Sequence, residues 1–278
     1  MAPSFKGYVL PGPTPPGLPE AEFPEGTSLD SISGQFKIFQ YKKGHRFSTD
    51  DVLAAWYGTT WAPSAARVLD LGSGIGSVGM VAAWRLPHAK FVTVEAQDIS
   101  VVLARKSAAF NGLTGRYDIR EGDFRDANVL RDDEVFDLVL GSPPYWPLED
   151  GLHGDHPQKI ACRFEVRGDV GDYMTTAAKH LAPGGFFAFV FPVNPPHQLA
   201  RVLEGARKAG LSIVRRRDVV LKEGEPPLLG LFAMVKSADL PERFRENTWN
   251  EPPLIIRTRE GAVHPEYAAI KLSFGFPP

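Results

Sequence analysis

The sequence predicts an α/β protein with a mostly parallel sheet, and three observations point to this class. From Arg67 onward, short runs rich in β-branched and aromatic residues alternate with helical stretches, which is the pattern of strands joined by crossover helices. The first of these runs ends in "LDLGSGIGSVG", which is typical of a turn from a strand into a helix. With 278 residues, 43% of them hydrophobic, the chain is long enough to bury the core that such a sheet needs.

The N-terminal part of the chain differs in composition from the rest. Residues 1–33 are rich in proline and glycine, so we expect a Pro/Gly-rich tail or a strap that lies on the surface. Residues 34–278 form the main domain, which begins with "QFKIFQYKKGHRF", a predicted strand or hairpin. Ser48 and Asp51 have the spacing of a capping box before "VLAAWYG", which predicts that a helix begins there.

The alternation after Arg67 predicts the remaining elements in order. The expected strands are "RVLDLG", "KFVTVEA", "YDIREGD", "FDLVLGS", "GGFFAFVFP", "SIVRRRDVVL" and "LLGLFAMVK". The expected helices cover about residues 76–86, 98–112, 171–181 and 195–209. Because only "KEGEPP" joins the last two strands, we expect them to be antiparallel neighbours. Residues 237–278 contain enough apolar side chains to pack back on the domain as an extension.

Charge and cysteine content limit the classes of function. Lysine and arginine total 31 against 33 acidic residues, a net charge of −2, so a nucleic acid would have to bind local positive patches. The single cysteine, Cys162, excludes an internal disulfide and fits a reducing cytoplasm. Its spacing from His153 and His156 is irregular for zinc, so we expect no metal. We find neither an apolar run of roughly 18 residues nor a signal peptide, and we expect a cytoplasmic protein.

The glycine-rich turn is the first candidate binding site. Asp70, Gly72, Gly74 and Gly76 lie where the first strand passes into a helix. Glycines there let a ligand approach the main chain closely, and the helix N-terminus offers free N–H groups. Glu95 ends the next strand, where an acid is placed to bind ribose hydroxyls. We therefore predict that this turn binds a cofactor with a ribose.

Two kinds of cofactor fit the turn. Gly74, Gly76 and Gly79 satisfy the G-x-G-x-x-G pattern of a dinucleotide site, so a dehydrogenase that uses NAD is one alternative. Asp70 favours another cofactor, because an acid at the end of the first strand repels a pyrophosphate and suits a cationic, amino-acid-bearing molecule.

At this point the sequence resembles a known family. "LDLGSGIG" is similar to the D-x-G-x-G-x-G motif of class I S-adenosylmethionine-dependent methyltransferases, and the resemblance covers about residues 34–278. It implies a Rossmann-like, seven-stranded, mostly parallel sheet with a C-terminal antiparallel strand pair, and S-adenosyl-L-methionine as the cofactor. It also implies that Glu95 binds the ribose and that Asp123, in "EGDF", contacts the adenine ring.

The fourth strand ends in Ser142-Pro143-Pro144-Tyr145, where these methyltransferases place their catalytic motif. Enzymes that methylate exocyclic amino groups carry Asn, Asp or Ser followed by Pro-Pro and an aromatic residue. The lone pair of an aromatic amine is delocalised, so acceptors must bind both amino hydrogens before the nitrogen attacks a methyl group. Ser142 Oγ and the Pro143 carbonyl are the expected acceptors, and Tyr145 is expected to stack on the base.

The flanking segments narrow the resemblance. "FKIFQYKKGHRFSTDDVLAAWYG" and "PPLIIRTREGAVHPEYAAI" are similar to the bacterial methyltransferases that modify N6 of adenosine 37 in valine tRNA. This implies that residues 34–62 cover the cofactor and substrate, and that Thr49 and Asp50 are neighbours of the cofactor. Without the resemblance, a role in capping the helix explains Thr49 and Asp50 equally well. Serine at position 142, where the relatives usually have the longer asparagine, leaves N4 of cytosine open as the target.

A mixture of cations and aromatic rings predicts an RNA surface. Such a mixture contacts phosphates and stacks unpaired bases, and it is found at Lys37, Lys42, Lys43, His45 and Arg46, interleaved with Phe36, Phe39, Tyr41 and Phe47. Further candidates follow the catalytic motif: Trp146, Lys159, Arg163 and Arg167. A solvated hairpin explains the first group equally well. A solvated sheet edge is the preferred reading of the run 215–217, "RRR".

These observations predict a methyltransferase for N6 of an adenosine in tRNA. Three alternatives remain besides N4 of cytosine. They are methylation of a protein glutamine side chain, hydride transfer with NAD, and RNA binding without catalysis.

Overall fold

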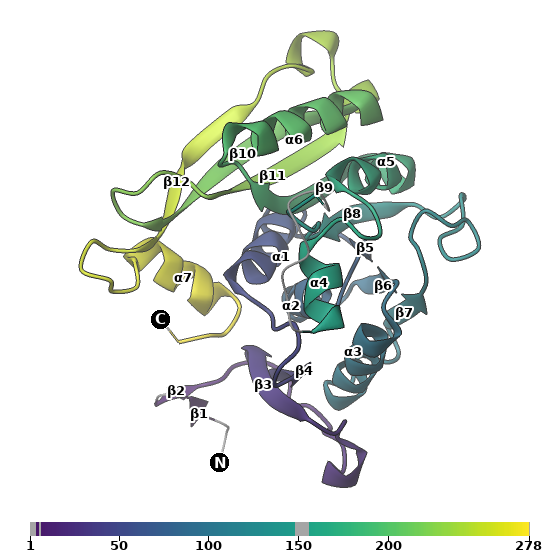
Figure 1. Ribbon diagram of the computed structural model, residues 1–278, viewed down its shortest axis with the longest axis vertical. Helices are drawn as coiled ribbons and strands as arrows, with labels where there is room; N and C mark the ends of the chain where they lie inside the picture. Colours follow the sequence, from purple (N-terminus) through teal and green to yellow (C-terminus); the bar gives the residue numbers. More distant parts are fainter. Residues whose placement is uncertain (1–3, 6, 148–155, 278) are drawn as a thin grey trace.

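The computed structural model describes residues 4–5, 7–147 and 156–277, and its centre is an eight-stranded sheet (Figure 1). The strand order is β12-β10-β11-β9-β8-β5-β6-β7. The strands are β5 (Arg67–Leu71), β6 (Lys90–Glu95), β7 (Tyr117–Glu121), β8 (Phe136–Gly141), β9 (Leu181–Pro192), β10 (Leu211–Lys222), β11 (Leu229–Lys236) and β12 (Trp249–Arg257). The strands β5 to β9 pair in parallel, while β11 is antiparallel to both β9 and β10. The predicted mostly parallel sheet with an antiparallel pair is confirmed.

The eighth strand, β12, was not expected, because it lies in the segment predicted as a packed extension. It pairs in parallel with β10 at one edge of the sheet. Its sequence contains Pro252 and Pro253, which lack an N–H and so weaken the pattern of a strand, but an edge strand tolerates them. β10 is therefore an inner strand.

Helices cover both faces of the sheet (Figure 1). The four helices expected after Arg67 correspond to α2 (Ser77–Arg85), α3 (Asp98–Phe110), α5 (Val170–His180) and α6 (Pro196–Ala209). The predicted capped helix is α1 (Thr49–Trp61), where the Ser48 N–H donates to Asp51 Oδ2 over 3.2 Å. Two helices were not expected, α4 (Pro157–Arg163) and α7 (Pro265–Ser273). Short 3-10 turns form at η1 (Glu20–Glu22), η3 (Ser237–Asp239) and η4 (Glu242–Phe244).

Alternating side chains of the strands divide the core into two layers. Leu138 and Leu140 of β8 pack in the cluster shared with α1, α2 and α3, whereas Val139 packs in the cluster shared with α5 and α6. In the second layer the rings of Phe187 and Phe189 stack with their centroids 4.9 Å apart. Burying each such side chain stabilises the fold by roughly 1.5–3 kcal/mol.

The N-terminal segment is more ordered than the predicted tail. β3 (Thr27–Ser33) pairs with β4 (Phe36–Tyr41) as an antiparallel hairpin, so the boundary predicted at residue 33 divides a hairpin. The strand β3 could not be predicted from its sequence, "TSLDSIS", because few of its residues are apolar. The remaining pair is β1 (Ser4–Phe5) with β2 (Tyr8–Val9).

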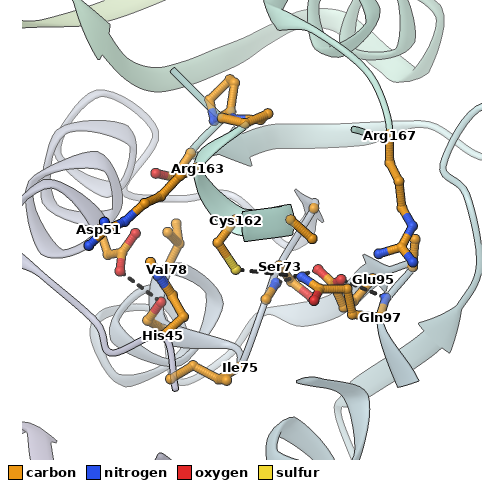
Figure 2. Close-up of a pocket in the computed structure, with 18 of the residues that line it drawn as sticks. His45, Asp51, Ser73, Ile75, Val78, Glu95, Gln97, Cys162, Arg163 and Arg167 are labelled. Atoms are coloured by element: carbon orange, nitrogen blue, oxygen red, sulfur yellow. Dashed lines mark hydrogen bonds between the residues drawn. The ribbon is translucent and has the colours of Figure 1, made fainter. Parts of the chain in front are cut away.

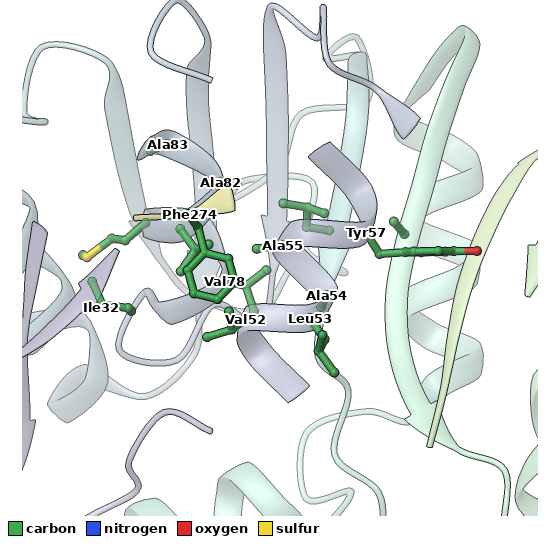
Figure 3. Close-up of a cluster of buried hydrophobic side chains, with 14 of the residues drawn as sticks. Ile32, Val52, Leu53, Ala54, Ala55, Tyr57, Val78, Ala82, Ala83 and Phe274 are labelled. Atoms are coloured by element: carbon green, nitrogen blue, oxygen red, sulfur yellow. The ribbon is translucent and has the colours of Figure 1, made fainter. Parts of the chain in front are cut away.

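The hairpin is tied to the C-terminal end of the chain. The Gly34 N–H and the Ser33 hydroxyl both donate to the Phe274 carbonyl, over 2.9 and 2.8 Å. Figure 3 shows Phe274 among Ile32 of β3, Val52 of α1 and Val78 of α2. The two ends of the domain thus share one core, which lies beneath the loop that leads to α1. Among the described residues, no helix is long and apolar enough to cross a membrane.

Candidate active site

A cavity of about 590 Å³ opens at the carboxyl ends of β5, β6 and β8 (Figure 2). The strand β5 has β6 as its neighbour on one side and β8 on the other, so the strand order reverses at this point. In open parallel sheets, ligands bind in the crevice that such a reversal creates. Its walls come from the loop before α1, the glycine turn, the segments after β6, β7 and β8, and α4.

The glycine turn forms the floor of this cavity. Gly72 and Gly74 both line it and both have positive φ, +60° and +55°, which favours glycine. A Cβ at Gly72 would lie 1.9 Å from the hydroxyl of Tyr173, so a side chain there is excluded. A Cβ at Gly74 would meet no atom within 4 Å, because it would enter the open space beside the cavity.

Glu95 fixes the turn from the neighbouring strand. Its carboxylate accepts the Gly74 N–H and the Gln97 N–H, each over 2.7 Å. Burial raises the pKa of Glu95, although these hydrogen bonds and the charge of Arg167 oppose the shift. In Figure 2 the Arg167 side chain extends toward Glu95. A buried carboxylate thus lines the cavity, with a cation on its open side.

Several of the predicted site residues do not line the cavity; among them, Phe36 and Phe39 are buried in the core and offer no ring to an RNA base. Asp70 is buried behind the turn, where Oδ2 accepts the Gly79 N–H over 2.9 Å and Oδ1 has no hydrogen-bond partner among the described residues. Burial raises its pKa well above the usual range. Gly76, with φ of +91°, caps α2, Thr49 is the first residue of α1, and Lys43 is exposed. Asp70 and Gly76 therefore support the turn from behind.

Asp123 lines the cavity at the end of β7 and is held by Arg125. The Arg125 guanidinium donates to Asp123 Oδ2 over 2.5 Å and reaches Asp172 over 3.2 Å. These contacts lower the pKa of Asp123. Its carboxylate stays charged beside Phe124, which lines the same part of the wall.

The predicted catalytic residues, Ser142 to Tyr145, all line the cavity. The Tyr145 hydroxyl donates to Asp50 Oδ2 over 2.6 Å, and its ring meets Phe191 edge-on at 5.7 Å. The Tyr145 N–H donates to the Arg163 carbonyl over 3.1 Å, and Gln198 donates to the Tyr145 carbonyl over 3.0 Å. The turn is therefore fixed on several sides.

Sequence reasoning assigned Asp51 only to a helix cap, and the structure gives it a second position. Its buried carboxylate lines the cavity, accepts the Ser77 hydroxyl over 3.1 Å and lies next to the Ser142 side chain. Burial and the neighbouring Asp50 raise the pKa of Asp51 to about 7. Two adjacent carboxylates at a helix start, Asp50 and Asp51, were the signal in the sequence.

Cations and a tryptophan surround the mouth of the cavity. The predicted RNA contacts Lys42, Arg46, Trp146 and Arg163 line it, together with His45, Lys159 and Arg167. Arg46 is also paired with Asp30 over 3.0 Å. Burial lowers the pKa of His45, so this ring favours its neutral form.

Residues of α4 complete the wall and were not singled out as site residues. Cys162 Sγ lies 3.5 Å from Gln97 Nε2, and burial raises the pKa of this thiol to about 12. Gln158 bridges two walls, because its side chain accepts the His45 N–H over 3.0 Å and donates to Ser100 Oγ over 2.9 Å. In the described part of the chain, no group of three or more His, Cys, Asp or Glu side chains is arranged to hold a metal ion.

The run 215–217 differs from the predicted solvated edge. These arginines have partners on α1, β10 and α7: Arg215 lies over the Trp61 ring at 3.5 Å, Arg216 pairs with Asp218 over 2.7 Å, and Arg217 pairs with Glu266.

Comparison with known proteins identifies similar methyltransferases. The model of the family described as methyltransferase small domain matches residues 58–208. A protein from Porphyromonas gingivalis named tRNA1(Val) (adenine(37)-N6)-methyltransferase is 31% identical over 86% of this chain and 92% of its own. A protein of the same name from Citrobacter koseri is 28% identical over the same shares of the two chains.

A solved structure described as a predicted O-methyltransferase from Agrobacterium tumefaciens has the same fold. Its TM-score is 0.63 at 21% identity, and the match covers 82% of this chain and 98% of that one. The chain therefore belongs to the methyltransferase small domain family.

Proposed function

We propose that this protein transfers a methyl group from S-adenosyl-L-methionine to N6 of an adenosine in tRNA. One observation carries the proposal: a single cavity joins the Gly72–Gly74 turn and Glu95 to the Ser142–Tyr145 turn. A methyl donor and an amino acceptor must meet in one place, and these turns supply a surface for each.

The residues of the floor fit the cofactor. The space beside Gly74 lets a ligand approach the main chain, and Glu95 offers an acceptor to ribose hydroxyls at the end of β6. Asp123 lies at the end of β7, on the side assigned to the adenine ring, and Asp50 lies on the opposite wall near Tyr145. When bound, the cofactor supplies a methyl group on a positively charged sulfur, which keeps the electron pair of the broken C–S bond.

The turn after β8 prepares the nucleophile. Ser142 Oγ and the Pro143 carbonyl accept the two amino hydrogens, which draws the nitrogen lone pair out of the ring and toward the methyl group. Pro143 and Pro144 stiffen the backbone that carries these acceptors. The hydrogen bond from Tyr145 to Asp50 holds the aromatic ring on which the base stacks.

The substrate class rests on the relatives and on the mouth of the cavity. The two relatives are named for adenine 37 of tRNA1(Val), and this chain offers Lys42, Arg46, Arg163 and Trp146 around its own cavity. Phosphates bind such cations, and unpaired bases stack on such rings. We propose tRNA as the partner and the cytoplasm, where tRNA is modified, as the location.

Incubation with labelled S-adenosylmethionine tests the proposal. Total tRNA, rRNA, DNA and protein are offered separately, and the nucleosides of each labelled product are analysed. The expected product is N6-methyladenosine in tRNA. Labelled N4-methylcytosine would change the target base, label on a protein glutamine would overturn the nucleic-acid substrate, and RNA binding without transfer would overturn the enzymatic role.

A further inference from the structure

Asp51 is a buried carboxylate in the cavity wall that the steps above leave without a function in catalysis. Only 6% of its surface is exposed. Its Oδ2 accepts the Ser48 N–H over 3.2 Å and the Ser77 hydroxyl over 3.1 Å, and its side chain lies next to that of Ser142. A helix cap alone requires neither the burial nor the contact with Ser142.

The proximity of Ser142 to Asp51 matters because a serine hydroxyl can both donate and accept hydrogen bonds. A hydroxyl carries one proton and two lone pairs, so its proton must point to an acceptor before its lone pairs can face the substrate. A carboxylate is an acceptor only. When Ser142 donates to Asp51, its oxygen is left free to accept an amino hydrogen from the cavity side.

We propose that Asp51 is a positioning residue that orients Ser142 and, through Ser142, receives the proton that the amino nitrogen loses on methylation. The proposal rests on the proposed function. As the methyl group is transferred, the N–H bond breaks and its electron pair stays on nitrogen, while the proton forms a new bond to Ser142 Oγ. The original hydroxyl proton moves from Ser142 to the Asp51 carboxylate, which releases it after the product leaves.

The surrounding structure supports this route. Asp50, the residue before Asp51, accepts the Tyr145 hydroxyl over 2.6 Å. Successive residues of α1 thus hold the two ends of the catalytic turn, so the path from the amino group through Ser142 to Asp51 is kept in place. The pKa of Asp51, raised to about 7 by burial and by Asp50, suits a group that gains and loses a proton near neutral pH.

The groups that face Asp51 come from several elements. Asp50 lies on α1 itself, Asp70 on β5, Tyr145 after β8, and Cys162 on α4; each interacts electrostatically with Asp51. In the view of Figure 2, the Arg163 side chain of α4 extends toward Asp51. Only the ionised form of Asp51 accepts the proton, so the methylation rate should rise as pH increases through the pKa of Asp51.

Single-turnover methylation of tRNA across the neutral pH range tests the route. We expect wild-type protein to show an acid limb, along which the rate falls as pH decreases. Asp51→Asn should lower the rate on the order of 100-fold and abolish the acid limb, while the affinity for S-adenosylmethionine stays unchanged. Asp133→Asn is the matched control, because Asp133 is exposed and pairs only with Arg131 in the described structure; it should retain the wild-type profile.

Asparagine preserves an oxygen for the Ser48 N–H, so Asp51→Asn keeps the helix cap, and a melting curve verifies the fold. Should that variant still fail to fold, Ser142→Asn provides a second measurement with Asp51 intact. An asparagine accepts amino hydrogens through its carbonyl oxygen but cannot pass a hydroxyl proton to Asp51, so the acid limb should again disappear.

A double-mutant cycle completes the test. The losses caused by Asp51→Asn and by Ser142→Ala should not add in the double variant, because both remove the same route. An acid limb that persists in Asp51→Asn or in Ser142→Asn, or losses that add, would overturn the role of Asp51 in an active enzyme. Wild-type protein that methylates no RNA would instead overturn the proposed function.

Discussion

The Tyr145 hydroxyl donates a hydrogen bond to the Asp50 carboxylate over 2.6 Å, between residues 95 positions apart in the sequence. This bond joins the N-terminus of α1 to the turn Ser142–Tyr145 after β8, and both segments line the cavity. The Tyr145 ring, which we propose holds the target base, is therefore positioned by α1 as well as by the segment after β8.

Tyr145→Phe keeps the ring and removes this bond. A hydrogen bond to a charged group contributes about 1.5 kcal/mol, which corresponds to roughly a tenfold loss of kcat. Steady-state methylation of tRNA measures the loss. Tyr8→Phe removes a hydroxyl from β2, outside the cavity lining, and should leave kcat unchanged. An unchanged kcat in Tyr145→Phe would show that the bond does not contribute to catalysis.

Gly74→Ala tests the open space at the glycine turn. Both Gly74 and Gly184 have positive φ and would meet no atom within 4 Å of a new Cβ, so alanine at either site costs about 1–2 kcal/mol of stability. Only Gly74 lines the cavity. Calorimetric titration with S-adenosylmethionine should therefore show weaker binding for Gly74→Ala and wild-type binding for Gly184→Ala. Equal affinities in the two variants would place the cofactor elsewhere.

Glu134 links stability to pH. Arg120 holds its carboxylate with two hydrogen bonds of 2.7 and 2.8 Å and lowers its pKa from 4.5 to about 2. A lowered folded-state pKa stabilises the protein above the unfolded value, and the contribution is lost as pH falls from about 4.5 toward 2. Glu134→Gln should lower Tm at neutral pH and flatten the fall of Tm in this acid window.

The matched control for the Glu134→Gln variant is Glu204→Gln. Glu204 forms an exposed pair with Lys208, and exposed pairs contribute little. Its Tm profile should follow that of wild-type protein. Parallel profiles for Glu134→Gln and wild type would mean that the buried pair with Arg120 does not set the acid stability.

Arg163 is expected to contact an RNA phosphate at the cavity mouth. Arg163→Ala should weaken tRNA binding and reduce the slope of log K against log salt by about 1. Arg216→Ala is the matched control, because Arg216 is bound to Asp218 on β10, and it should keep the wild-type slope. Filter binding at several salt concentrations measures both. A wild-type slope in Arg163→Ala would remove this residue from the RNA surface.

The strands of the sheet and much of the cavity lining were predictable from sequence for a common reason. Glu95 ends a strand, Ser142 directly follows one, and Gly74 lies in the turn after one. The ends of parallel strands meet at one edge of a sheet. Their proximity therefore follows from the order of the elements alone, before any side chain is placed.

Other features depend on contacts between distant segments. The sequence around Asp51 is fully explained by a helix cap, and only folding brings Ser142 to it. Asp70 was expected to face the cofactor because of its position in the motif, but its carboxylate turns back to the Gly79 N–H. The prolines of β12 concealed an edge strand whose pairing depends on β10.

The contact between Ser33 and the Phe274 carbonyl has a consequence for the order of assembly on the ribosome. The two partners are separated by 241 positions, so the hairpin of β3 and β4 emerges early but finds its anchor only after α7 has been synthesised. The loop that carries Lys42 and Arg46 follows this hairpin directly. That loop therefore gains its final anchorage only when the chain has been synthesised as far as Phe274.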